Sequence, residues 1–163
     1  MPAGIAAGIA TAYGELGSGP VAVRSSATAE DLAQASFAGQ QESYLNIEGS
    51  AQVLEAVENC WASLFEARAI HYRTGAGFDH LDVGIAVVVQ KMVQSQRSGV
   101  MFTLHPVTND TTQVVIEAVW GLGEAIVSGQ VSHDMYIVDK ATGALLECEV
   151  TPQEQEMVRN PTA

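Results

Sequence analysis

The residues whose types and spacing point most directly to chemistry are Arg24 and the short polar segment that follows it. The run 21–32 places Arg24 at the end of an apolar stretch and then continues through serine, alanine and threonine. Such a segment presents backbone N–H groups and one fixed cation to a single anion. A guanidinium stays charged at neutral pH and can bind two oxygens of one phosphate. The segment therefore predicts a phosphate grip centred on Arg24, although a surface ion pair with Glu30 or Asp31 would also account for a cation here.

Two glutamates, Glu117 and Glu124, are the candidates for a cation site. Glu117 interrupts an apolar run, where a charge is costly unless it is exposed or paired, and Glu124 follows the glycine turn at 121–123. Carboxylate oxygens combine with phosphate oxygens around hard cations such as Mg²⁺. A place on a sheet edge or a solvated face explains Glu117 equally well. The four histidines lack the spacing of metal ligands, and structural roles are expected for them.

The elements that must position these groups are helical early in the chain and extended later. Helical periodicity predicts helices over about residues 5–16 and 50–72, the second broken by the glycines at 74–77. Apolar or alternating runs predict strands at 21–24, 41–47, 83–93, 99–104, 113–119, 135–139 and 145–150, with 83–93 as a central buried strand and turns at 108–110 and 141–143. This order favours an α+β fold with two lobes, 1–93 and 94–163, the second β-rich.

Composition narrows the class of protein and its partners. The chain has 163 residues, of which 47% are apolar and 16% charged, as expected of a compact domain. Nineteen acidic against seven basic residues give a net charge of −12, which repels polyanions and argues against nucleic-acid binding. No apolar run reaches the ~20 residues of a membrane span. Two cysteines without metal spacing fit free thiols, so a cytoplasmic protein without a membrane partner is expected.

Several motifs, taken in order, resemble a known family. The likeness is carried by residues 21–32, 35–41, 60–65, 77–80, 89–93, 98–103 and 120–124. Together they resemble the PEP/pyruvate-binding, ATP-grasp-type nucleotide domain shared by phosphoenolpyruvate synthase, pyruvate phosphate dikinase and rifampicin phosphotransferase. There is no GxxxxGK[ST] motif, so the chain is not a P-loop protein.

The resemblance implies a role for each candidate residue, with ATP and Mg²⁺ as the cofactors. Arg24 would contact the nucleotide phosphates, and a flap would lie over them. The backbone at Gln90 and Lys91 would read the adenine edge at a hinge between the lobes. The remaining implied site residues are the flap residues Ser36, Gly39 and Gln40, the site-facing Arg68, the ring-sandwiching Met92 and Val93, and the metal or phosphate-network residues Glu117 and Glu124. Arg68 would equally lay its stem over the core and reach solvent, as long cations do.

The resemblance also implies a reaction and further domains. The parent enzyme would use MgATP to phosphorylate a carrier histidine and pass the phosphoryl group to pyruvate or another acceptor. Its phosphohistidine domain and acceptor-binding domain would be the partners of this chain. The family's opening glycine-and-lysine segment and its closing Glu and Leu-Gln-x-Arg strands have no counterpart here, so an incomplete domain, inactive by itself, is expected.

Three alternatives stay open on sequence alone. A degenerate lobe that binds a partner protein through its acidic face is the alternative from a different class. A small regulatory nucleotide sensor is another. Within the family, residues 98–108 look more like the rifampicin-phosphotransferase branch, whereas 77–80 look more like phosphoenolpyruvate synthase.

Overall fold

The computed structural model describes residues 1–27, 31–32, 35–36, 43–76 and 83–160. The chain divides into two compact units, unit 1 (Met1–Met92) and unit 2 (Val93–Ala163). Each unit has its own sheet and its own buried side chains.

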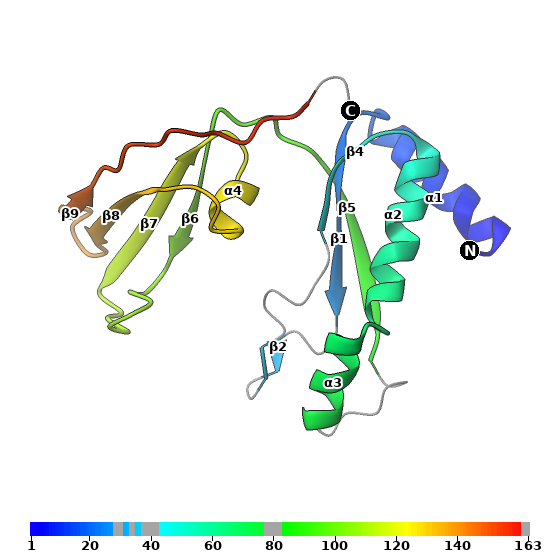
Figure 1. Ribbon diagram of the computed structural model, residues 1–163, viewed down its shortest axis with the longest axis horizontal. Helices are drawn as coiled ribbons and strands as arrows, with labels where there is room; N and C mark the ends of the chain where they lie inside the picture. The colour runs from blue at the N-terminus through cyan, green and yellow to red at the C-terminus, as the bar shows by residue number, and fades with distance from the viewer. Residues whose placement is uncertain (28–30, 33–34, 37–42, 77–82, 161–163) are drawn as a thin grey trace. The chain divides into compact units, whose positions relative to one another are not determined.

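Unit 1 is a small antiparallel sheet with helices against one face. Its elements are α1 (Ala3–Glu15), β1 (Val21–Ala27), β2 (Asp31–Leu32), β3 (Ala35–Ser36), β4 (Ser43–Ile47), α2 (Ser50–Ser63), α3 (Ala67–Ala76) and β5 (Ile85–Lys91). The strand order is β4-β1-β5, and β2 and β3 pair separately. Figure 1 shows α1 and α2 on the same side of the three-stranded sheet, with α2 against the strands and α1 beside α2.

The core of unit 1 forms where alternate β1 side chains meet one stripe of α2. Val21 and Val23 lie two residues apart on β1, so they share a face. Val53, Val57 and Cys60 recur at helical spacing and pack against them. A buried tyrosine also fixes α1 to the start of α2: the Tyr13 hydroxyl accepts the N–H of Gly49 at 2.9 Å and lies 2.8 Å from the carbonyl of Ser18.

Two sequence-based expectations for unit 1 are wrong. The helix expected over 50–72 is two helices, because α2 ends at Ser63 and α3 begins at Ala67 and continues through the glycine expected to break it. The buried Arg73 of α3 donates a hydrogen bond to the carbonyl of Leu64, which caps the end of α2. The strand expected to be central and buried, β5, lies at the edge of the described sheet and pairs there only with β1. Alternate residues of β5 are exposed, so one of its two faces is not buried.

Unit 2 is a meander of antiparallel strands. Its elements are β6 (Arg97–Phe102), β7 (Gln113–Trp120), α4 (Glu124–Val127), β8 (Asp134–Asp139) and β9 (Leu145–Glu149), with strand order β6-β7-β8-β9. The short helix α4 packs against β7, and Val115, Val119, Leu122, Ala125 and Ile137 are buried. The two expected turns are confirmed, with positive φ at Asn109 and Gly143.

A glycine turn joins β7 to α4 and holds two distant segments. Gly121 has φ +76° and donates its N–H to Gln96 at 2.9 Å. The hydroxyl of Ser98 donates to the Gly121 carbonyl at 2.7 Å. The N–H of the next residue, Leu122, donates to the backbone carbonyl of Met157 at 2.8 Å. The turn therefore anchors both the segment before β6 and the final segment of unit 2.

The overall class agrees with expectation. Helices come mostly in the first half, strands in the second, and the sheets are antiparallel, so the predicted α+β class is confirmed. Within the described ranges, no helix combines the length and the apolar character needed to cross a bilayer.

Candidate functional site

The sheet of unit 1 presents Arg24 on the face that α2 does not cover. Val23 and Ser25, its neighbours on β1, are buried, whereas Arg24 and Ser26 are exposed. This alternation follows from the pleat, which sends successive side chains to opposite faces. Arg24 pairs with Ser43 on β4 and with Val88 on β5, so it stands in the middle of the sheet with a strand on each side.

Gln90 shares the exposed face with Arg24. Its register partner on β1 is Ala22, two residues from Arg24, and Gln90 itself is two residues from Val88. Residues two apart on a strand lie about 7 Å from one another on the same face. The structure therefore brings the predicted phosphate ligand and a predicted base-reading residue onto one surface, from segments more than sixty residues apart in the chain.

The next three predicted residues are placed differently. Lys91 pairs with the buried Val21, so it belongs to the opposite face, and it is exposed at the last residue of β5. Met92 is partly buried, and its N–H donates to the carbonyl of Pro20 at 2.9 Å. Val93 is 74% exposed and is the first residue of unit 2. Of the four, Gln90 is the one whose side chain shares a face with Arg24.

The electrostatic setting of Arg24 suits an anionic ligand. In the ranges the structure describes, Arg24 forms no ion pair. The chain has seven basic residues against nineteen acidic ones, a net charge of −12, so few side chains are suited to bind an anion and Arg24 is one of them. Glu30 and the side chain of Asp31 lie outside the described residues, so the alternative of an ion pair between Arg24 and either of them stays a prediction. An exposed guanidinium can offer its donors to phosphate oxygens.

Some predicted residues fall outside what the structure describes. Gly39 and Gln40 of the expected flap lie outside the described residues. Ser36 ends β3, where its backbone pairs with Asp31, and its side chain is not described. Arg68 is the second residue of α3, and its side chain is likewise outside the described part. Their assigned roles stay predictions.

The two candidate metal residues lie in unit 2. Glu117 is on β7, between β6 and β8, so the sheet-edge explanation for this residue is wrong. Its side chain is 26% exposed, and its Oε1 lies 3.9 Å from Nε2 of His133. Glu124 is the first residue of α4. In the described part of the chain, no three His, Cys, Asp or Glu side chains gather as a metal site. Two carboxylates with phosphate oxygens are nevertheless a normal donor set for Mg²⁺.

Sequence reasoning missed two neighbours of Arg24, namely Ser43 and Val88. Both are exposed and both are register partners of Arg24. Val88 lies in a run of three valines, where composition gives no sign of which one faces outward. Ser43 starts a strand whose register is set by a bulge opposite Ala22. Only the pairing of strands reveals either residue.

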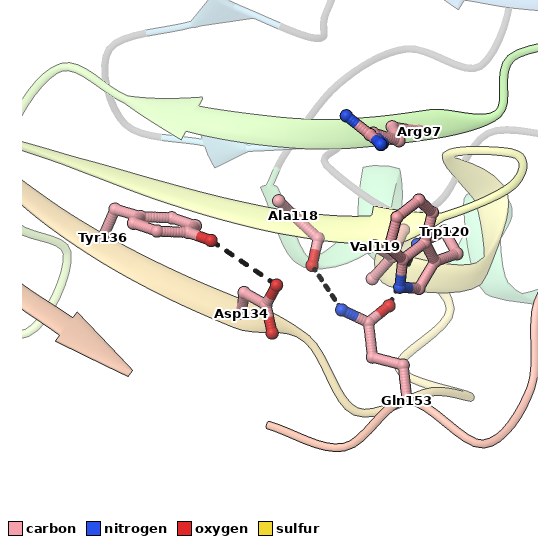
Figure 2. Close-up of a pocket in the computed structure, with 7 residues that line it drawn as sticks. All are labelled: Arg97, Ala118, Val119, Trp120, Asp134, Tyr136 and Gln153. Carbon is pink, nitrogen blue, oxygen red and sulfur yellow. Dashed lines mark hydrogen bonds between the residues drawn. The ribbon is translucent and has the colours of Figure 1, made fainter. Parts of the chain in front are cut away.

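Unit 2 contains a separate hollow of ≈ 340 Å³, shown in Figure 2. The guanidinium carbon of Arg97 lies 4.7 Å from the centre of the Trp120 ring, a cation–π contact. Gln153 closes one side, with its Oε1 accepting the N–H of Trp120 at 2.9 Å. Desolvation raises the pKa of Tyr136 above its ordinary 10.0, and the Asp134 carboxylate adds to the rise. None of the predicted site residues lines this hollow.

Comparison with known proteins covers the whole chain. The family described as "Pyruvate phosphate dikinase, AMP/ATP-binding domain" matches residues 1–163. The chain is 54% identical over 167 residues to a probable phosphoenolpyruvate synthase of Pyrococcus abyssi and 53% identical over 167 residues to the phosphoenolpyruvate synthase of Pyrococcus furiosus. Each alignment covers 99% of this chain and 20% of the relative.

A third relative matches more closely over a shorter stretch. The probable phosphoenolpyruvate synthase of Methanothermobacter thermautotrophicus is 62% identical over 130 residues, which is 80% of this chain and 19% of that protein. The chain thus spans about a fifth of the length of these relatives. The match over all residues, with the ordered motifs and the α+β architecture, shows that the chain belongs to the AMP/ATP-binding domain family of pyruvate phosphate dikinase and phosphoenolpyruvate synthase, whose fold is ATP-grasp-like.

Proposed function

We propose that this chain binds MgATP as the nucleotide-binding part of a phosphoenolpyruvate synthase-like dikinase. The observation that carries the proposal is the shared exposed face of Arg24 and Gln90 in unit 1. The family description names AMP and ATP, and the relatives are phosphoenolpyruvate synthases. The parent protein would transfer a phosphoryl group from ATP to a carrier histidine on another domain, and then to pyruvate or another acceptor.

The phosphate end of the nucleotide is assigned to Arg24. Its guanidinium offers a fork of donors, which suits the oxygens of a polyphosphate. The adjacent hydroxyl of Ser43 lies in the same row of the sheet. Ser36, Gly39 and Gln40 would complete the grip from the flap, and Arg68 would add a second cation from α3.

The base end is assigned to the second half of β5. The side chain of Gln90 offers both a donor and an acceptor to the edge of a purine. In the described sheet β5 has one neighbour, so alternate backbone groups between Val88 and Lys91 point away from β1, toward where we place the base. Met92 and Val93 would contribute the apolar contacts to the ring. The segment 90–93 includes the division between units 1 and 2, which we propose to be the two lobes of the domain.

The metal is assigned to the β7–α4 segment. Glu117 and Glu124 would supply carboxylate oxygens to Mg²⁺, and phosphate oxygens and water would complete the coordination. The bound metal would neutralise charge on the phosphates. The chain's own residues would position the nucleotide, without covalent chemistry. Neither Cys60 nor Cys148 forms a disulfide, which fits the reducing cytoplasm where we place the protein.

The proposal is tested by titrating MgATP into the ¹⁵N-labelled chain up to millimolar concentration and following amide shifts by NMR, which detects weak binding. We expect shifts on β1 and β5. Arg24→Ala should weaken binding by about 1.5–3 kcal/mol, the range for hydrogen bonds to a charged group. Arg97→Ala removes the same charge from unit 2 and serves as the matched control, with affinity near that of the wild type. Absence of binding by the wild type, or equal weakening by both variants, contradicts the proposal.

A further inference from the structure

Val88 is an exposed apolar side chain at the centre of the candidate nucleotide face of unit 1. It is 49% exposed in mid-strand, whereas its neighbours Val87 and Val89 pack against the core cluster of unit 1. Those two residues bury the apolar surface that β5 contributes to the core. Val88 points to the other face and contributes to the surface that carries Arg24 and Gln90.

The position of Val88 relative to those polar residues limits what it can contact. It is the direct register partner of Arg24, which places their Cβ atoms about 5 Å apart, and Gln90 follows two residues along the same strand. Two residues complete the group of four with Arg24 and Gln90: Ala22 on β1, which is buried, and Val88 on β5, which is 49% exposed. A ligand that binds Arg24 and reaches Gln90 therefore finds Val88 as the apolar side chain it can contact. The part of the ligand above Val88 contacts methyl groups. Methyl groups offer a phosphate no hydrogen-bond donor or positive charge, but they can bury the apolar surface of a sugar or base ring.

We propose that Val88 is a specificity-determining contact for the nucleoside part of the ligand. Its methyl groups support the ribose or base of a nucleotide whose phosphates are bound by Arg24. This inference rests on the proposed function and adds to it a discrimination: the face binds a nucleoside polyphosphate in preference to an inorganic polyphosphate of similar charge.

The test compares two probes, MgATP and magnesium tripolyphosphate, on the same variants of the chain. Val88→Thr keeps the β-branched shape and replaces one methyl with a hydroxyl, and Val88→Ile keeps the apolar surface. We expect Val88→Thr to lower the affinity for MgATP about fivefold and to leave the affinity for tripolyphosphate unchanged. The reason is that only the nucleoside part of the ligand loses apolar contact. Val88→Ile should retain the affinity for MgATP. Val127→Thr alters a valine of unit 2 that is 73% exposed, and should change neither affinity.

The outcomes separate this inference from the function on which it rests. If the wild type binds both probes and Val88→Thr leaves MgATP unaffected, the inference is wrong and the proposed function stands. The same holds if Val88→Thr weakens both probes equally, because the change then acts through Arg24. If the wild type binds no MgATP, the proposed function fails and this inference fails with it. Equal thermal midpoints for wild type and Val88→Thr would show that the comparison concerns binding alone.

Discussion

At the scale of single residues, Gly121 is constrained both by its backbone angle and by its neighbour. Its φ is +76°, and a Cβ added there would overlap the backbone carbonyl of Met157. The left-handed conformation costs an L-residue about 1–2 kcal/mol. The overlap adds to this, because the carbonyl is held by a hydrogen bond from Leu122 at 2.8 Å. We expect Gly121→Ala to lower the free energy of unfolding by about 2–4 kcal/mol, measured by urea denaturation.

Gly143 provides the control for the backbone angle alone. Its φ is +70°, but in the described part of the chain no atom beyond Gly143 itself and its two chain neighbours lies within 4 Å of the position its Cβ would take. Gly143→Ala should therefore cost only about 1–2 kcal/mol. If the two variants lose equal stability, the contact with Met157 has no energetic consequence and the final segment is not anchored at Gly121.

At the scale of elements, the β8–β9 hairpin is closed by a carboxylate that titrates at low pH. Oδ1 of Asp139 accepts the hydroxyl of Thr142 at 2.6 Å and its N–H at 2.8 Å. These hydrogen bonds hold the pKa of Asp139 below its ordinary 3.8, and the one from the hydroxyl has the larger effect. A carboxyl whose pKa is lower in the folded than in the unfolded chain stabilises the folded state at any pH above its unfolded-state pKa. That contribution is lost as the pH falls below 3.8 and through the folded pKa.

Replacement of the hydroxyl tests this account of the hairpin. Thr142→Val removes the larger cause and keeps the N–H, so the pKa of Asp139 should rise toward, but stay below, its ordinary value. Carboxyl-carbon NMR titration measures the change. Thr111→Val is the control, because the Thr111 hydroxyl makes no hydrogen bond in the described residues. This variant should leave the pKa of Asp139 unchanged. An unaltered pKa of Asp139 in Thr142→Val would assign the depression to the backbone instead.

The helices and strands themselves were largely predictable, because periodicity and turn residues are local signals. The short elements β2, β3 and α4 were not predicted, and neither was the break between α2 and α3. Leu64, Phe65 and Glu66 continue a helical pattern, yet at the break Arg73, nine residues beyond Leu64, donates a hydrogen bond to the Leu64 carbonyl. A contact of this kind depends on the packing of the buried guanidinium, which propensity does not report.

The candidate site was predictable by residue type but not by arrangement. Arg24 and Gln90 are identifiable from motifs, yet alternation alone cannot say that they share a face, since a register slip of one residue would separate them. The pairing of Arg24 with Val88 decides it. The same pairing excludes the side chain of Lys91 from that face, although Lys91 is the next residue in the motif.

At the scale of the whole molecule, the net charge predicts which form of the proposed nucleotide ligand binds more tightly. The chain carries −12, so it repels a polyphosphate everywhere except near its few cations. Magnesium neutralises about two of the nucleotide's negative charges, which reduces this repulsion and also supplies a ligand-binding cation. We therefore expect MgATP to bind more tightly than ATP in EDTA, compared by NMR titration at one ionic strength.

The glutamates of the β7–α4 segment separate the two causes of that preference. If Glu117 and Glu124 hold the metal, Glu117→Gln and Glu124→Gln should each weaken MgATP and leave or improve the binding of free ATP, because a negative charge has been removed. If they contribute only to the general repulsion, both forms should bind more tightly. Glu147→Gln removes one charge from an exposed strand of the same unit, so it isolates the general effect. Behaviour of Glu117→Gln and Glu124→Gln like that of Glu147→Gln would remove both residues from the proposed metal site while leaving the Arg24 face intact.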